Sequence, residues 1–208
     1  DCAVATLCHG LARGCDRAVL VRSLALYCKY VMENPAETAA VYSEAGAMVM
    51  RALPRMPARA AEGKERRLKV AFLGGELHRH SVTYYLRGVF DHLDSAQFEL
   101  GAYSTGRAED DVSRALAERC SFWRRLPGAG GSAIADKIRA DGVDVLIDLG
   151  GWLLETGHID VLARQPAPLQ LTYCGFPNTT GLATVYGRIV DSTTDPDGSE
   201  AFSSEWLL

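Results

Sequence analysis

The spacing of hydrophobic positions changes near residue 68. Within residues 20–31 they recur at intervals of three and four, which places them on one face of a helix. A second helix is expected after Asn34, because Asn is a good N-cap and the following Pro35 is tolerated in a first helical turn. Residues 1–53 therefore predict a helical region, which residues 54–67, rich in Pro, Ala and charge, join to the rest as a linker.

From Leu68 onward, short apolar runs alternate with amphipathic stretches. The expected strands are 68–73, 97–103, 121–126, 143–149, 168–174 and 188–192, and the expected helices are 81–93, 108–120, 130–142 and 158–165. We expect Ser132 to cap the third of these helices and Gly142 to follow its end. Strands and helices in this order predict an α/β fold with a parallel, doubly wound, Rossmann-like sheet, preceded by α-helices.

Ligands of doubly wound sheets bind beyond the carboxyl ends of the strands. This rule selects four loops as candidate site segments. They are residues 74–80, the loop after Tyr103, residues 150–156 and residues 175–184.

Composition narrows the class of protein. The 208 residues are 48% hydrophobic and 23% charged, which allows one sizeable core with a helical appendage. The net charge of −4, spread along the chain without blocks, gives no reason to expect binding to nucleic acid or an anionic membrane. The longest apolar runs fall far short of the roughly 20 residues that a membrane span needs.

The six cysteines form no CxxC pair. We interpret them as small buried hydrophobes in a reducing compartment, with a disulfide or metal role as the alternative. A cytoplasmic or nuclear location fits this usage.

The loop "GGELHRH" carries two glycines and two histidines. It lacks the GxGxxG pattern and the following acid of a dinucleotide site, which disfavours NAD binding. His80 precedes a helix that Ser81 opens, and the positive end of the helix dipole disfavours imidazolium there. A neutral His80 could accept a proton or a hydrogen bond, although an ordinary capping role is the alternative. No such argument applies to His78.

The loop "CGFPNTTG" (174–181) combines turn-forming residues with two hydroxyls. Thr179 and Thr180 could contact a ligand, and Gly181 would allow its close approach. Polar clusters of this kind also commonly cap helices, so the loop alone does not identify a site.

Longer motifs resemble the catalytic region of the O-GlcNAc transferase and SPINDLY family. They are "HSVTYYL", "VDVLIDLGG", "RQPAPLQLTYCGFPNTTGLATVYGRIVDSTTDP" and "SSEWLL", and the resemblance runs from about Leu68 to Leu208. "PNTTGL" and "HSVTYY" are more similar to the SPINDLY branch than to animal O-GlcNAc transferases.

The resemblance implies an inverting protein O-glycosyltransferase with a two-lobed GT-B fold. Such enzymes move a sugar from UDP-GlcNAc or GDP-fucose to Ser or Thr of nuclear and cytosolic proteins, without a metal or other cofactor. Residues 68–208 would be the N-terminal lobe, and residues 1–53 the possible end of a tetratricopeptide array. We expect a fragment without the C-terminal lobe, which binds most of the nucleotide, and thus inactive alone.

The resemblance also assigns site residues. His80 matches the active-site histidine of the family and would contact the donor sugar or relay the acceptor proton. The residues expected to line the cleft between sugar and peptide are Gly175, Phe176, Pro177, Asn178, Thr179 and Thr180.

Three departures from the family pattern lie near this site. Glu76 stands at an expected aspartate, Trp152 and Glu155 stand where small and basic residues are expected, and "VYG" (185–187) replaces "MDY". They support an alternative from another class, a non-catalytic peptide-binding module or a decayed homologue.

Overall fold

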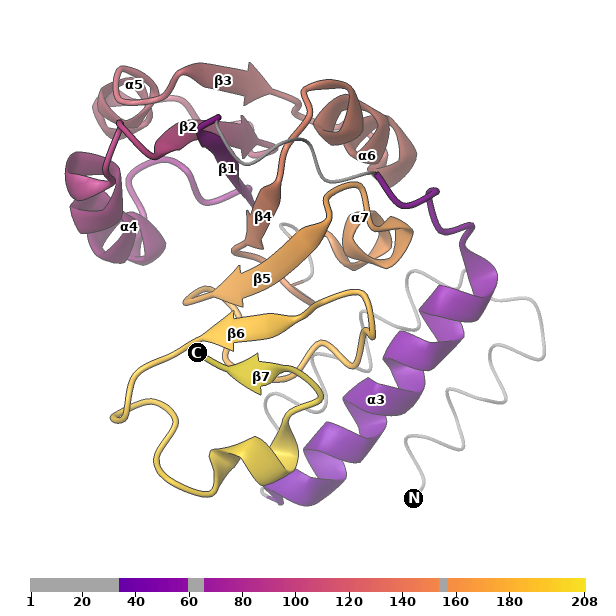
Figure 1. The fold of residues 1–208 in the computed structure, drawn as a ribbon. Coiled ribbons are helices and arrows are strands. Elements are labelled where there is room, and N and C mark those ends of the chain that lie inside the picture. The colour runs from indigo at the N-terminus through magenta and orange to yellow at the C-terminus, as the bar shows by residue number, and fades with distance from the viewer. Residues whose placement is uncertain (1–33, 60–65, 154–156) are drawn as a thin grey trace.

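A single parallel sheet organises the computed structural model, which describes residues 34–59, 66–153 and 157–208 (Figure 1). The strand order is β3-β2-β1-β4-β5-β6-β7, and each neighbouring pair is parallel. The strands are β1 (Leu68–Gly74), β2 (Phe98–Ser104), β3 (Phe122–Arg125), β4 (Val145–Asp148), β5 (Leu169–Tyr173), β6 (Gly187–Ile189) and β7 (Trp206–Leu207). The expected parallel, doubly wound architecture is confirmed. The final strand β7 was not expected.

Helices cover both faces of this sheet (Figure 1). They are α3 (Pro35–Ala52), α4 (Ser81–His92), α5 (Asp111–Ala117), α6 (Gly131–Ala140) and α7 (Ile159–Arg164), with a 3₁₀ turn η1 (Ser199–Phe202). Val70 and Phe72 of β1 belong to the core under α4 and α5, whereas Ala71 and Leu73 belong to the core under α3, α6 and α7. The alternation follows from the two-residue period of a strand.

The helix starts test the capping expectations. Asn34 caps α3 as expected, because its side-chain oxygen accepts the N–H of Ala36 at 3.0 Å. The expectation for Ser132 was wrong, since the N-cap of α6 is Gly130, two residues earlier, which offers no side chain. Gly142 does follow the end of α6, with a φ of 69° that suits glycine. The helix expected within residues 16–33 lies outside the described residues.

Helix α3 shares the core of the sheet domain. Tyr42 of α3 is 1% exposed, and its ring lies 5.5 Å from the Phe176 ring and 6.2 Å from the Trp152 ring. A β-carbon on Gly46 would lie 2.2 Å from the carbonyl oxygen of Gly181, so the helix touches the β5–β6 loop backbone directly. The described part of the predicted helical region is therefore packed against the lobe. Among the described residues, no helix is long and apolar enough to cross a membrane.

Candidate functional site

The sheet changes its winding direction between β1 and β4, which are neighbours in the sheet. Their carboxyl ends therefore open into the crevice where doubly wound sheets bind ligands. The loop after β2 closes onto the loop after β1: the N–H of Thr105 donates to the Gly74 carbonyl at 3.1 Å. A β-carbon on Gly106 would lie 2.1 Å from the carbonyl oxygen of Gly75, so only glycine permits this approach.

Arg79 fixes the loop that carries the two histidines. Its backbone N–H donates to Asp110 at 2.8 Å, and its guanidinium pairs with Asp111 at 2.7 Å. Hydrogen bonds from the N–H groups of Ser113 and Arg79 lower the pKa of Asp110, and the hydrogen bond from the Arg79 side chain lowers that of Asp111. Both carboxylates are therefore ionised at neutral pH, and the loop is tied to the start of α5.

His80 is exposed and is itself the N-cap of α4, in place of the expected Ser81. The ring Nδ1 of His80 accepts the backbone N–H of Val82 at 3.3 Å. The backbone N–H of His80 donates to the Thr83 hydroxyl at 3.4 Å. Because Nδ1 accepts, this hydrogen bond assigns the ring proton of a neutral His80 to Nε2. Nε2 is therefore a hydrogen-bond donor. The capping role of His80 is confirmed, while its contact with a ligand stays a prediction.

The two histidines differ in their surroundings. His78 is half-buried, and its ring centroid lies 5.9 Å from that of His80 at an interplanar angle of 60°. The carbonyl of His78 accepts the Thr83 hydroxyl at 3.0 Å. The structure thus gives His78 a place within the turn and leaves the exposed position to His80.

A buried polar chain that the sequence did not reveal runs beneath these loops. Asp148 ends β4, and its Oδ2 accepts the N–H of Gly151 at 2.5 Å. Its Oδ1 lies 3.5 Å from Nδ1 of His158, whose Nε2 lies 2.9 Å from the Thr105 hydroxyl. The side chains of Asp148 and His158 are 0% and 8% exposed. This row of polar side chains joins the loop after β2 to the loop after β4. The only sign of it in the sequence was an acid near the end of the apolar run "VDVLIDL".

Trp152, one of the departures from the family pattern, is a core residue. It is 4% exposed, and its indole N–H donates to the Thr180 carbonyl at 2.9 Å. It therefore braces the β5–β6 loop from the β4–α7 loop. Glu155 lies outside the described residues.

The β5–β6 loop begins with close backbone contacts. A β-carbon on Gly175 would lie 1.9 Å from the Leu149 carbonyl oxygen. Cys174 just before it has a φ of 49°, which is uncommon outside glycine. Cys174 is exposed, so the expectation that the cysteines are buried was wrong at this position.

The structure places the six loop residues expected at the sugar–peptide cleft in two groups. Phe176, Thr179 and Thr180 are buried, and both threonine hydroxyls bond to Glu205. Gly175 and Asn178 are half-buried and Pro177 is exposed. Their contact with a sugar or peptide stays a prediction, but the buried threonines already have structural partners.

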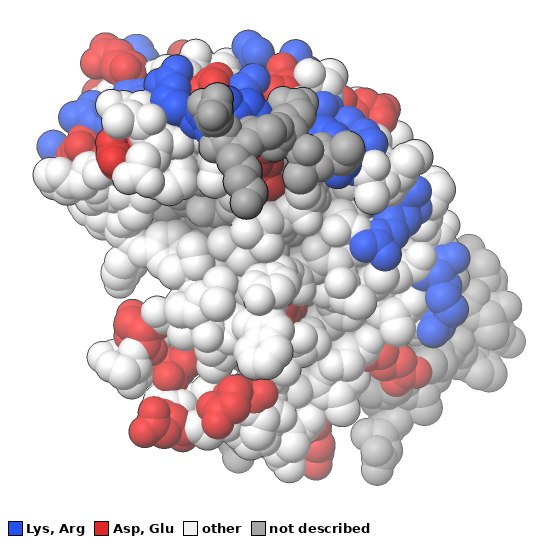
Figure 2. All heavy atoms as spheres, viewed as in Figure 1, with Lys and Arg blue, Asp and Glu red and all other residues white. Residues whose placement is uncertain are grey.

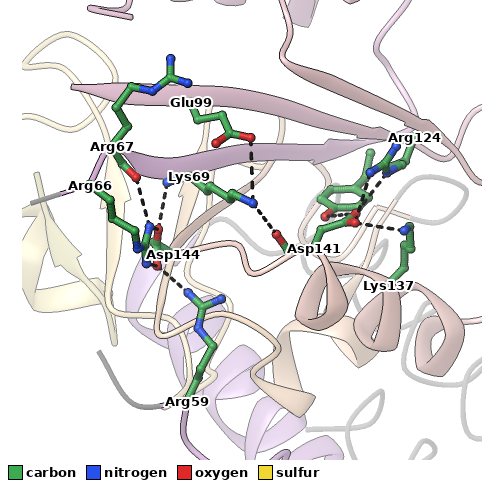
Figure 3. Close-up of polar contacts among 10 residues, drawn as sticks. Arg59, Arg66, Arg67, Lys69, Glu99, Arg124, Lys137, Asp141 and Asp144 are labelled. Carbon is green, nitrogen blue, oxygen red and sulfur yellow. Dashed lines mark hydrogen bonds and ion pairs between the residues drawn. The ribbon is translucent and has the colours of Figure 1, made fainter. Parts of the chain in front are cut away.

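Charged residues at the opposite edge of the sheet are paired with one another (Figure 3). Asp144 accepts Arg59, Arg66 and the N–H of Lys69, while Asp141 accepts Arg124, Lys137 and the Tyr103 hydroxyl. In Figure 2 the Lys and Arg side chains at the top of the view are interspersed with acidic ones. This edge is thus occupied by ion pairs.

In the described residues no group of three or more His, Cys, Asp and Glu could hold a metal ion.

Comparison with solved structures gives a match over the whole lobe. The match is to a mutant of the O-GlcNAc transferase of Thermobaculum terrenum, with a TM-score of 0.84 and 26% sequence identity. It covers 99% of the present chain and 40% of the transferase chain. The fold of this chain therefore resembles the matching part of that transferase.

Curated relatives carry the same similarity in sequence. The probable UDP-N-acetylglucosamine–peptide N-acetylglucosaminyltransferases SPINDLY of Petunia hybrida and Arabidopsis thaliana are 32% and 30% identical, each over 69% of this chain. A UDP-N-acetylglucosamine–peptide N-acetylglucosaminyltransferase of Caenorhabditis elegans is 25% identical over 62% of this chain. The chain spans only 16% of the length of the two plant proteins and 11% of the nematode protein.

The model of one protein family, described as glycosyl transferase family 41, matches residues 36–207. The match includes α3 and every strand of the sheet. It confirms the resemblance to the O-GlcNAc transferase and SPINDLY proteins that the motifs indicated. The chain therefore belongs to glycosyl transferase family 41.

Proposed function

We propose that the protein containing this chain is an inverting O-glycosyltransferase that moves a sugar from a nucleotide sugar to Ser or Thr of other proteins. Family membership and the names of the relatives support the reaction class. This chain would supply the half of the site that faces the acceptor and the donor sugar. A second lobe would bind most of the nucleotide, which is UDP-GlcNAc or GDP-fucose.

The observation that carries the proposal is the position of His80. Its ring lies at the start of α4, beside the crevice between β1 and β4, with Nε2 left for a ligand. Because Nδ1 accepts the Val82 N–H, Nε2 donates. A hydrogen bond from Nε2 to an oxygen of the donor sugar is therefore favoured over removal of the acceptor proton.

The β5–β6 loop would form the opposite wall of the cleft. Of the predicted residues, exposed Pro177 and half-buried Asn178 have side chains that a ligand could reach. The leaving diphosphate would be stabilised by fixed positive groups of the second lobe. The reaction as proposed needs no metal, and it would take place in the cytoplasm or nucleus.

The altered β4–α7 loop has a structural explanation in part, because Trp152 is a buried brace. A non-catalytic peptide-binding module would nevertheless share this core. Calorimetry of the full-length protein with UDP-GlcNAc and with GDP-fucose separates the two, because a non-catalytic module should bind neither donor.

The direct test is sugar transfer by the full-length protein from each radiolabelled donor to a peptide library with one central Ser or Thr. The proposal predicts label on that library and none on a matched library with Ala or Val. Absence of transfer from both donors would refute it. The donor that supports transfer also decides between GlcNAc and fucose.

A further inference from the structure

A buried carboxylate just before β7 is the central partner of the β5–β6 loop. Glu205 is 4% exposed, although it belongs to a short segment between η1 and β7 with exposed neighbours on both sides. Acidic side chains are rarely buried in this way unless donors surround them. Glu205 therefore has a task in the fold that its sequence position does not show.

The donors to Glu205 come mainly from two threonines of the loop. Oε1 accepts the N–H of Thr180 at 2.7 Å and also the Thr180 hydroxyl, and Oε2 accepts the Thr179 hydroxyl at 2.6 Å. The hydroxyl of Ser203 donates to Oε2 at 2.9 Å. Both carboxyl oxygens of Glu205 are thus satisfied by hydrogen bonds, as expected for a buried polar group.

A second buried charge holds the same loop from β6. Arg188 is 6% exposed, and its guanidinium donates to the Pro177 carbonyl at 2.5 Å and pairs with Asp195. The loop between these two anchors is thus fixed on both sides of Asn178. For the side chain of Asn178 no hydrogen bond is recorded within the described part of the chain.

We propose that Glu205 is a positioning residue, which fixes the β5–β6 loop so that the Asn178 amide faces the sugar–peptide cleft. The inference rests on the proposed function for the role of the cleft, but the hold of Glu205 on the loop does not. An amide donates and accepts at once, which suits the hydroxyl groups of a sugar or the backbone of an acceptor peptide. Asn178 is then the contact residue, and Glu205 acts through the loop.

The test uses full-length protein with Glu205→Ala, Glu205→Gln, Thr180→Val and Asn178→Ala, with Glu200→Ala as control. Glu200 lies in η1 of the same segment, is exposed, and accepts only the nearby Gly198 N–H in the described structure. The readouts are amide hydrogen exchange at Thr180 and Leu182, and kcat and KM for the peptide library.

In Glu205→Ala we expect exchange of the Thr180 amide to accelerate at least about tenfold, because this buried N–H loses its acceptor. The Leu182 N–H donates to the Thr180 hydroxyl at 3.2 Å and reports indirectly on the same part of the loop. Exchange of Leu149, whose N–H donates to Leu73 in the sheet, should stay unchanged. Glu205→Gln keeps one acceptor oxygen and should recover most of the protection. Glu200→Ala should match the wild type. If Glu205→Ala does not fold, Thr180→Val, which removes the hydroxyl that donates to Glu205 and accepts the Leu182 N–H, should show a smaller acceleration at the Thr180 amide.

In the transfer assay, Glu205→Ala and Asn178→Ala should both lose about tenfold or more in kcat/KM. Of these two variants, only Glu205→Ala should change exchange at the Thr180 amide. Unchanged exchange in Glu205→Ala, or in Thr180→Val where Glu205→Ala does not fold, overturns the positioning role. Normal transfer by Asn178→Ala overturns the assigned contact. If the wild type transfers no sugar, the proposed function fails, while the exchange data still decide whether Glu205 holds the loop.

Discussion

The indole nitrogen of Trp152 donates to the carbonyl oxygen of Thr180 at 2.9 Å, across 28 positions of sequence. The contact joins the loop after β4 to the loop after β5, the two segments that border the crevice on the side away from β2. Tyr42 of α3 packs against the same indole with ring centroids 6.2 Å apart. A residue that looked like a departure from the family pattern therefore holds three elements together.

Replacing Trp152 by Phe and by Ala separates the contribution of its hydrogen bond from that of its ring packing. Trp152→Phe keeps most of the ring but leaves the buried Thr180 carbonyl without its donor, so we expect a loss of about 1–2 kcal/mol in the free energy of unfolding. Trp152→Ala also leaves a cavity and should cost about 3–5 kcal/mol. Urea unfolding measures both. Equal losses in the two variants would show that the hydrogen bond, and not the packing, dominates.

Gly46 of α3 tests the contact between α3 and the β5–β6 loop, and Gly88 of α4 is its matched control. In Gly46→Ala the new β-carbon would meet the Gly181 carbonyl oxygen at 2.2 Å. The position of the β-carbon is fixed by the helix backbone and the oxygen belongs to the loop backbone, so neither can yield cheaply. We expect a loss of about 1–3 kcal/mol from this overpacking. In Gly88→Ala on α4 nothing lies within 4 Å of the new atom. That variant should gain about 0.5–1 kcal/mol from helix propensity. Thermal unfolding of both variants checks the opposite signs, and a stabilised Gly46→Ala would contradict the close packing of α3.

The buried pair of Asp148 and His158 should respond asymmetrically to substitution. His158→Ala leaves Oδ1 of Asp148 in a buried site with no imidazole beside it, and we expect a loss of about 1–3 kcal/mol. Thr105→Val removes only the half-buried hydroxyl at the other end and should cost less. Chemical denaturation ranks the two variants. A larger effect of Thr105→Val would mean that the contact of His158 with the loop after β2 contributes more to stability than its contact with Asp148.

Asp144 makes the stability sensitive to acid. Burial alone would raise its pKa, but hydrogen bonds from Arg66 and from the Lys69 N–H, with the charges of Arg66 and Arg59, outweigh burial and lower it. The contribution of a carboxylate with a lowered pKa is complete above the ordinary Asp value of about 4 and is lost as pH falls through the folded pKa. Asp144→Asn should therefore be less stable than the wild type at pH 7, and the difference should shrink at about pH 3.

Exposed Asp136 on α6 provides the control for this titration. Asp136→Asn should follow the wild type at both pH values. A difference between Asp144→Asn and the wild type that stays constant from neutral to acid pH would remove Asp144 from the acid response.

Local patterns predicted β1 to β6 and their parallel arrangement, because apolar runs and glycine or proline breaks are encoded within a few residues. They did not predict β7 or the order of the strands in the sheet. "VDVLIDL" became the buried strand β4, and Asn34 capped α3 as its side chain predicts. The cap of α6 was mispredicted because Ser132 and Gly130 are both plausible starts, and the turn before the helix decided between them.

Of the candidate site, the sequence could select only one residue beside a helix start, and the contact of that residue with a ligand stays a prediction. His80 could be chosen from its place before α4, but its role as N-cap depends on a backbone torsion that no pattern shows. The partner of Thr179 and Thr180 lies 25–26 positions away in Glu205. The partners of His158 are Thr105 in the loop after β2 and Asp148 at the end of β4. Long-range polar contacts of this kind follow from packing and not from spacing.

The most direct measurement of the central claim is sugar transfer by full-length His80→Asn, compared with the wild type. Asn is as good an N-cap as any residue, so α4 should start normally and the thermal midpoint should stay unchanged, while the Nε2 donor is lost. The account predicts a fall in kcat/KM of at least about tenfold, as expected when a hydrogen bond to the reacting sugar is removed. His78→Ala should retain most of the activity. Wild-type transfer by a stable His80→Asn would contradict the account, because the imidazole would then serve the helix alone.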